Sequence, residues 1–118
     1  MAAVEQAPGL WRTDLQEHDL SVPGRKAIQN RVEIGPEAPA VRHWHPGEEI
    51  IYVLEGTLEY EIDGDPGRIV SAGEALTVPA ERVHSVRNVG DGNAAELATY
   101  IVEKDQPLFN LAEEGRNV

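Results

Sequence analysis

The amino-acid sequence predicts an all-β fold, an antiparallel sandwich or barrel. About eight short strand-like runs follow one another at a spacing of roughly 8 to 12 residues. Turn-forming groups rich in Gly, Pro, Asn and Asp separate these runs, and no segment sustains the period of a long helix. The chain has 118 residues, which suits one domain with one hydrophobic core.

The chain divides into three expected parts. Residues 1–27 carry no sustained period, so we expect an N-terminal extension there, which could serve as an arm that contacts a partner subunit. Residues 28–107 hold the strand-like runs and form the predicted barrel. Residues 108–118 form a C-terminal tail, in which residues 108–114 are the one stretch compatible with a helical turn.

Two hydrophobic patterns distinguish the strands. Residues 49–54 are nearly continuous apolar sequence, which is typical of a strand covered on both faces. Residues 57–62 alternate, so that Leu58, Tyr60 and Ile62 face inward and the acids face outward. The other strand-like runs are residues 28–34, 68–70, 75–78, 83–89 and 96–102.

A metal site is indicated by His43, His45 and the carboxylates that follow them. In an extended strand, residues two apart point to the same face and lie about 6.6 to 7 Å apart. Both imidazoles can therefore direct a ring nitrogen at one point. Pro46-Gly47 is a turn dipeptide that folds the chain back, and this turn brings Glu48 or Glu49 toward the same point.

A four-ligand site needs one more donor, and the chain contains four His in total. His84 is the better candidate because it follows a short apolar strand and a turn, and opens another strand-like run at residues 84–88. His18 lies among Asp14, Glu17 and Asp19. We expect this histidine to be solvated.

Composition argues against several partners and chemistries. The chain has 21 Asp plus Glu against 10 Lys plus Arg, a formal net charge of -11. Such a surface repels phosphate backbones and anionic lipids, so we expect no nucleic-acid or membrane partner. Without cysteine there is no disulfide, thiolate ligand or cysteine nucleophile. The chain shows neither a long apolar span nor signal-peptide features, so we expect a cytoplasmic protein.

Two segments resemble the two sequence motifs of the cupin superfamily. The first motif reads Gly, five residues, His-x-His, three or four residues, Glu, six residues, Gly; this chain matches with His43, His45, Glu49 and Gly56. The second reads Gly, five residues, Pro-x-Gly, two residues, His, three residues, Asn; this chain matches with Gly73, Pro79, His84 and Asn88. The resemblance runs from about residue 32 to residue 100, and the chain looks like a small single-domain, quercetin-dioxygenase-like cupin.

Two positions depart from these motifs. The opening Gly of the first motif is replaced by Glu37, and the nearest glycine is Gly35, so the preceding strand could enter the site differently. The Gly of Pro-x-Gly is replaced by Glu81. Either this turn does not need a positive φ at that position, or it tolerates strain there.

The resemblance implies the cupin double-stranded β-helix, an antiparallel jelly roll, and it selects Glu49 over Glu48. The implied metal ligands are His43, His45, Glu49 and His84. We expect one divalent transition metal per chain, and three imidazoles with one carboxylate suit Fe, Mn, Ni, Zn, Co or Cu without choosing among them. Similar cupins are frequently homodimers, so we also expect a homodimer.

Strand alternation predicts a small and mostly apolar substrate pocket. The inward-facing positions are Ile51, Val53, Tyr60, Val78, Val86 and, in the last strand, either Ala98 and Tyr100 or Leu97 and Thr99. Tyr60 and Tyr100 could donate hydrogen bonds to a substrate. Asn88, in contrast, is expected to satisfy backbone groups near its own strand end.

Two functions are compatible with these features. The first is a metal-dependent enzyme acting on a small oxygen-bearing organic substrate that chelates the metal. Dioxygenase, isomerase and lyase chemistries all fit; dioxygenase-like chemistry is favoured, and Glu49 is the candidate general base. The second is a metal-containing cupin that binds or senses a small ligand without turnover. The fold alone does not choose between them.

Overall fold

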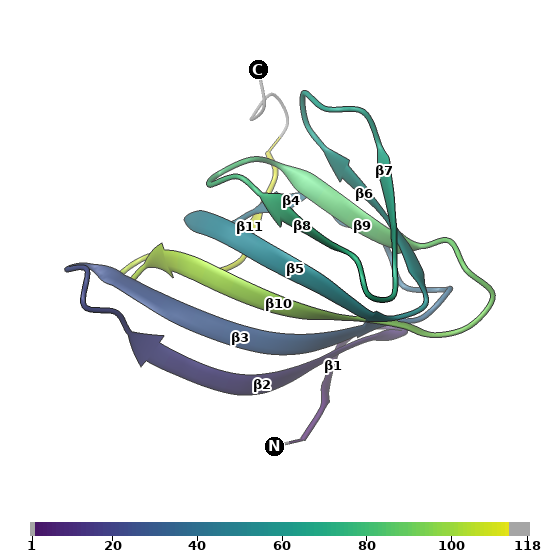
Figure 1. Ribbon diagram of the computed structural model, residues 1–118, viewed down its shortest axis with the longest axis horizontal. Coiled ribbons are helices and arrows are strands. Elements are labelled where there is room, and N and C mark those ends of the chain that lie inside the picture. The colour runs from purple at the N-terminus through teal and green to yellow at the C-terminus, as the bar shows by residue number, and fades with distance from the viewer. Residues whose placement is uncertain (1, 114–118) are drawn as a thin grey trace.

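The computed structural model describes residues 2–113, which form eleven strands and no helix. The strands make two antiparallel sheets that face each other (Figure 1), and the predicted all-β antiparallel fold is confirmed. The six-stranded sheet has the order β1 (Val4–Ala7), β2 (Leu10–Asp19), β3 (Arg25–Ile34), β10 (Ala94–Glu103), β5 (Gly47–Glu55) and β8 (Ala75–Val78). The five-stranded sheet has the order β11 (Asn110–Leu111), β4 (His43–Trp44), β9 (His84–Asn88), β6 (Thr57–Ile62) and β7 (Arg68–Ser71).

The described residues contain no helix long and apolar enough to cross a lipid bilayer.

The N-terminal segment contains strands that the sequence did not predict. β1 and β2 extend the six-stranded sheet beyond β3, which itself begins at Arg25. The register of β2 against β3 shifts between Asp14 and Gln16. This irregularity breaks the two-residue alternation on which strand prediction depends. Contact of this segment with a partner subunit remains a prediction.

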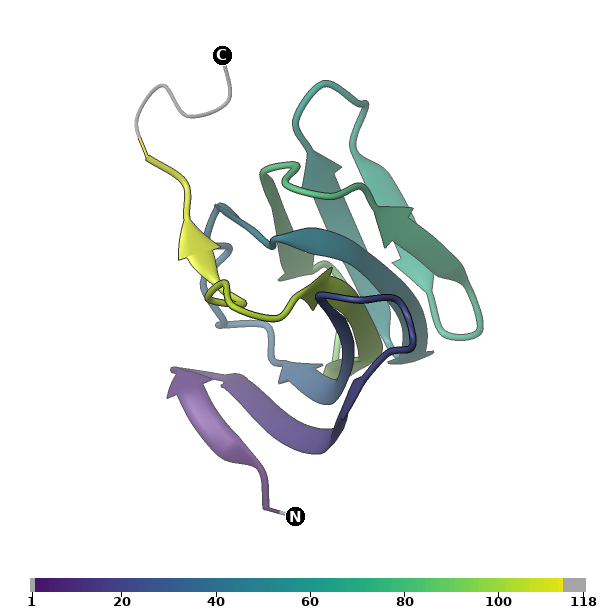
Figure 2. The ribbon, with the colours of Figure 1, turned by 90° about the vertical axis from the view of Figure 1, so that its left-hand side faces the viewer.

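The C-terminal segment also differs from the expectation. In place of a helical turn, residues 108–113 contain β11, which pairs antiparallel with β4. Figure 2 shows this short strand in yellow, near the C-terminal end of the described chain. The remainder of the expected turn, residue 114, lies outside the described residues.

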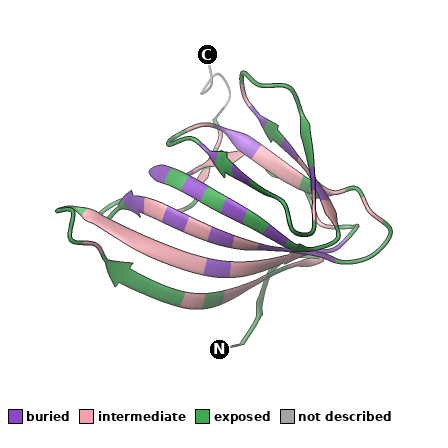
Figure 3. Cartoon of the chain, in the orientation of Figure 1, coloured by how far each residue is buried: buried purple, intermediate pink, exposed green. Residues whose placement is uncertain are grey.

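The core lies between the two sheets. Leu58, Tyr60 and Ile62 of β6 are all buried, as their alternation predicts. β5 also alternates strictly (Figure 3), so the expectation that both of its faces are covered is wrong. Ile51 and Val53 are fully buried, whereas the intervening side chains, Ile50, Tyr52 and Leu54, are 45%, 47% and 40% exposed.

Gly47 and Glu81 are the backbone positions that most directly shape the site. A Cβ at Gly47 would overlap the carbonyl oxygen of Ile101 and lie 2.7 Å from the Val102 Cα, so only glycine allows β5 to approach β10 this closely. Glu81 has φ of 61°. The turn before β9 therefore does need a positive φ at the position where the motif has glycine, and Glu81 accepts the associated strain. Its amide donates to the carbonyl of His45 at 3.0 Å.

Candidate functional site

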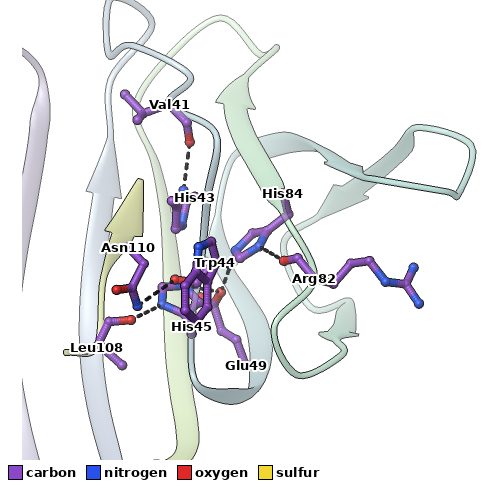
Figure 4. A network of polar contacts seen from close by, with 9 residues as sticks. All are labelled: Val41, His43, Trp44, His45, Glu49, Arg82, His84, Leu108 and Asn110. Carbon is purple, nitrogen blue, oxygen red and sulfur yellow. Dashed lines mark hydrogen bonds and ion pairs between the residues drawn. The ribbon is translucent and has the colours of Figure 1, made fainter. Parts of the chain in front are cut away.

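Three imidazoles from two neighbouring strands and a loop converge at one end of the space between the sheets. His43 of β4 lies directly opposite His84 of β9 in the strand register, and His45 follows β4. Each of the three rings offers one nitrogen, and these three atoms lie within 4.8 Å of one another. Figure 4 shows the three side chains pointing toward a common centre.

Glu49 reaches this centre from the opposite sheet. Its Oε1 lies 3.1 Å from His84 Nε2 and 3.3 Å from His45 Nε2. Glu49 is buried, whereas Glu48 points to the exposed face of β5. Strand alternation thus places Glu49 at the histidines, as the motif spacing implied.

All three histidines are oriented by backbone carbonyls. The Nδ1 of His43 is 2.7 Å from the Val41 oxygen, that of His45 is 2.7 Å from the Leu108 oxygen, and that of His84 is 2.9 Å from the Arg82 oxygen. A carbonyl oxygen only accepts a hydrogen bond, so each Nδ1 carries the donated proton. Each Nε2 is therefore left to face the centre, the arrangement by which proteins orient metal-binding imidazoles.

Electrostatics favours the metal-binding protonation states. Burial, and after it the charge of His84, lowers the pKa of His43 to about 4. His43 is therefore neutral at pH 7. Burial alone would raise the pKa of Glu49, but its contacts with His45 and His84 outweigh that effect and hold the pKa below its usual range. Glu49 is therefore ionised.

The donor set fits a divalent metal ion. Within residues 2–113, the buried Nε2 of His45 has no hydrogen-bond partner, although the ionised Glu49 lies beside it. The contacts that hold Glu49 ionised require positive charge on these rings or between them. With each Nδ1 proton donated to a carbonyl, that charge is either a second proton on Nε2, as the His84 Nε2–Glu49 Oε1 contact of 3.1 Å allows, or a metal ion at the centre. Three nitrogens and one carboxylate oxygen suit a divalent transition metal. The residues that could hold this ion are His43, His45, Glu49 and His84.

A cavity of about 450 Å³ opens beside these residues. Tyr60, Tyr100 and Val86 line it, as the sequence predicts for a pocket. Ile51 and Val53 do not: their side chains are completely buried in the hydrophobic core, where they pack against the opposite sheet. Val78 belongs to the same core.

The most notable lining residue that the sequence analysis missed is Glu96. Its side chain is 3% exposed and lines the cavity from β10. The sequence alone did not decide which face of this strand is buried. The structure buries Ala98, Tyr100 and Val102, and Glu96 shares their parity. The signal was therefore the alternation of the strand, once one of its faces had been chosen.

The C-terminal segment forms part of the site as well. Phe109 stacks on the ring of His43, with centroids 4.7 Å apart and an interplanar angle of 22°. Its neighbour Leu108 supplies the carbonyl that orients His45. Because the carbonyl belongs to the backbone and acts across the fold, no side-chain motif could have indicated this role.

Two polar side chains that were not expected to bind the metal, His18 and Asn88, lie as the sequence predicts. His18 is exposed, and its Nδ1 lies 2.6 Å from the Asp19 carbonyl oxygen. The Asn88 amide donates to the carbonyls of Ile34 and Gly92 and accepts from the Gly90 amide. Asn88 therefore fixes the backbone around the end of β9.

Residues 30–102 match the family described as the cupin domain. Among curated proteins, the polyketide synthase CurC of Streptomyces cyaneus is 43% identical over 53 residues, which are 44% of this chain and 34% of that protein. Germin-like protein 1-1 of Oryza sativa subsp. japonica is 36% identical over 75 residues, which are 59% of this chain and 35% of that protein. The match thus spans about a third of the length of each of these relatives.

Solved structures show the same fold. The polyketide cyclase RemF of Streptomyces resistomycificus superposes with a TM-score of 0.70 at 23% sequence identity, over 95% of this chain and 80% of that one. The cupin-like protein of Thermotoga maritima gives a TM-score of 0.70 at 22% identity, over 92% and 81% of the two chains. Because the family match covers more than half of the sequence, we conclude that this chain belongs to the cupin domain family.

Proposed function

We propose that this chain is a metal-dependent cupin that acts on a small oxygen-bearing organic substrate. His43, His45, Glu49 and His84 would hold one divalent transition metal. The observation that carries this proposal is the common orientation of the histidines: all three Nδ1 atoms bond to backbone carbonyls, which leaves three Nε2 atoms for a single ion.

The chemistry would take place where the cavity meets these ligands. A bound ion of this kind supplies Lewis-acid polarisation of a chelating oxygen or activation of dioxygen. Glu49 is the ionised carboxylate at this end of the cavity, and it could accept a proton from the substrate. Tyr100 lies opposite Glu49 in the β5–β10 register and lines the same cavity, and its hydroxyl is within reach of this carboxylate.

The cavity and the relatives together support a substrate class. Tyr60, Tyr100, Phe109 and several aliphatic side chains line the cavity, whose volume suits a small ligand. The names of CurC and RemF refer to polyketide synthesis and polyketide cyclisation. We therefore favour a ketone or phenol of the polyketide kind. Dioxygenase, isomerase and lyase chemistry on such a substrate remain proposals, and dioxygenase-like chemistry is preferred to the other two.

The metal ligands are tested by elemental analysis of the purified protein and three variants. We expect about one metal ion per chain in the wild type, and less than about a tenth of that in His43→Ala and in His84→Ala. His18→Ala is the matched control, because His18 is exposed and outside the site, and it should keep the wild-type content. Full metal content in both site variants would show that the ligand assignment is wrong.

Turnover is tested separately from metal binding. The metal-loaded protein is incubated in air with a flavonol or a diketone, while oxygen consumption and product formation are followed. Product that depends on His84 supports an enzyme. Tight binding with no product on prolonged incubation would favour the alternative, a cupin that captures or senses a small ligand. The homodimer and the cytoplasmic location expected from the sequence remain predictions.

A further inference from the structure

We propose that the Tyr60 hydroxyl and the Glu96 carboxyl form a second polar subsite of the cavity, which binds an acceptor oxygen of the substrate at the end away from the histidines. This inference rests on the proposed function, because it concerns the other end of the substrate that would reach the metal ligands. It gives a joint role to two residues that line the cavity and sets a requirement on the ligand.

The first argument is burial without partners. Tyr60 and Glu96 are 1% and 3% exposed, and both line the cavity. Within the described part of the chain, Tyr60 Oη and Glu96 Oε2 are buried side-chain atoms without a hydrogen bond of good geometry, and each is the polar side chain closest to pairing with the other. A buried polar atom without a partner costs about 1–3 kcal/mol. A phenol and a neutral carboxyl carry one O–H donor each, so pairing the two groups with each other uses one donor and leaves the other directed at the cavity. That free donor indicates a site for an acceptor oxygen.

The second argument is the position of the two groups. Tyr100 lies opposite Glu49 in the register of β10 against β5, and Glu96 lies four residues before Tyr100 in β10. At about 3.3 Å per residue, the two Cα positions are about 13 Å apart. Tyr60 comes from the facing sheet, where it is opposite Val86, and Val86 is two residues beyond His84. The subsite is thus separated along the strands from the histidines but shares their cavity.

The third argument is the hydrogen-bonding character of the pair. Burial, and after it the charge of Glu49, raises the pKa of Glu96 well above its usual value. This shift favours the neutral carboxyl, the form that can donate a hydrogen bond. Burial also raises the pKa of Tyr60, with Glu96 as the next contributor, so its hydroxyl stays protonated. A tyrosine hydroxyl beside a neutral carboxylic acid is a known arrangement for binding a carbonyl oxygen on which negative charge develops.

These arguments define the ligand more closely. It has chelating oxygens at one end, a mostly apolar body, and a carbonyl or similar acceptor oxygen at the other end. A ligand that lacks the second oxygen would leave one O–H donor of the Tyr60–Glu96 pair without an acceptor and would lose affinity.

The test uses two catechols that differ only at the remote end. Both 3,4-dihydroxyacetophenone and 4-isopropylcatechol carry the chelating diol, but only the first has an acceptor oxygen in its substituent. Their dissociation constants are measured by calorimetry on the metal-loaded wild type, and the ratio of the two constants is the preference for the ketone. The same samples are analysed for metal.

Variants assign that preference to the two residues. Tyr60→Phe and Glu96→Leu should each reduce the preference about three- to tenfold, the effect of one hydrogen bond. Glu96→Gln keeps an N–H donor, so its preference should stay within about twofold of the wild type. The matched controls are Tyr52→Phe and Glu48→Leu, because both residues are on the exposed face of β5; they should leave the preference unchanged.

The outcomes separate this inference from the proposed function. If Tyr60→Phe and Glu96→Leu fold, as judged by circular dichroism, and keep the wild-type preference, the subsite is refuted and a structural water satisfies both groups. A stronger preference in Glu96→Gln would also refute it, because Glu96 would then be an ionised acceptor. A wild type that takes up no metal would refute the proposed function alone, since the ketone preference, then measured on the metal-free protein, would still report on Tyr60 and Glu96.

Discussion

At the scale of single residues, backbone carbonyls orient all three histidines of the candidate metal centre. His43 and His84 are each oriented by the carbonyl two positions earlier in the chain, so the residues just before β4 and β9 fix them. His45 is oriented by Leu108, which lies 63 positions later. The tautomer of one ligand therefore depends on a segment far away in the sequence.

Glu96 leads to a prediction about pH. Its folded-state pKa is raised, so the stability it contributes is fully present below about pH 4.3, the ordinary Glu value, and is lost as the pH rises. Glu96→Gln removes this loss. In urea titrations of metal-free protein, the unfolding free energy of the variant relative to wild type should therefore increase above about pH 4.3, by at most about 1.4 kcal/mol per pH unit.

The control for this prediction is Glu48→Gln, which removes one negative charge from the exposed face of β5. A difference between Glu96→Gln and wild type that stays constant from pH 4 to pH 8 would contradict a neutral Glu96.

The residues that the sequence could and could not predict differ in a physical way. Motif spacing and strand parity are local signals, and they locate His84 in the histidine cluster and Tyr60 in the lining of the cavity; the roles of both residues remain predictions. Glu96 required knowing which face of β10 is buried, and that is decided by pairing with β3 and β5. The role of Leu108 lies in its backbone, so its side chain gave no signal.

At the scale of elements, the start of β5 depends on Gly47. A methyl group there would overlap the backbone of β10, so Gly47→Ala should force the two strands apart. We expect a loss of about 1–3 kcal/mol in the unfolding free energy, the usual cost of overpacking. Gly92→Ala is the matched control, because nothing lies within 4 Å of the added Cβ. Equal stability of the two variants in urea would contradict this account.

The C-terminal strand gives a second prediction at this scale. A chain that ends at Asp105 lacks β11, the Leu108 carbonyl and the Phe109 ring that stacks on His43. Loss of such an orienting partner typically weakens metal binding 10- to 100-fold. Competition with a chromophoric chelator should show this loss, whereas a chain that ends at Glu113 should bind like the full-length protein. Unchanged affinity after the longer truncation would remove β11 from the site.

Strand prediction worked best where one face is buried and the register is regular. β6 meets both conditions, and its inward residues were identified correctly. β2 meets neither, because most of its residues are at least partly exposed and its register against β3 shifts. β11 has only two residues and is held by β4, so it carries too little sequence to show any period.

At the scale of the whole molecule, the candidate ligands connect the two sheets. His43 and His84 are on strands of the five-stranded sheet, and Glu49 is on a strand of the six-stranded sheet. An ion bound by all of them stabilises the folded chain by mass action, about 2.7 kcal/mol at a free metal concentration 100 times the Kd. For a domain of this size, the melting temperature should rise by roughly 10 °C or more.

This prediction is checked by thermal unfolding with metal and with an excess of chelator. His84→Ala is the negative control, and its melting temperature should respond much less to metal. A wild type that melts at the same temperature under both conditions would show that the ion, if bound, does not connect the sheets.

The division of the ligands between two sheets also bears on how the protein assembles. A chain in which one sheet alone has formed holds only part of the donor set, so it cannot bind the ion tightly. During refolding, high-affinity metal binding would therefore appear only when the two sheets dock. The rate at which the chain acquires this binding would report the rate of docking, the last step of folding.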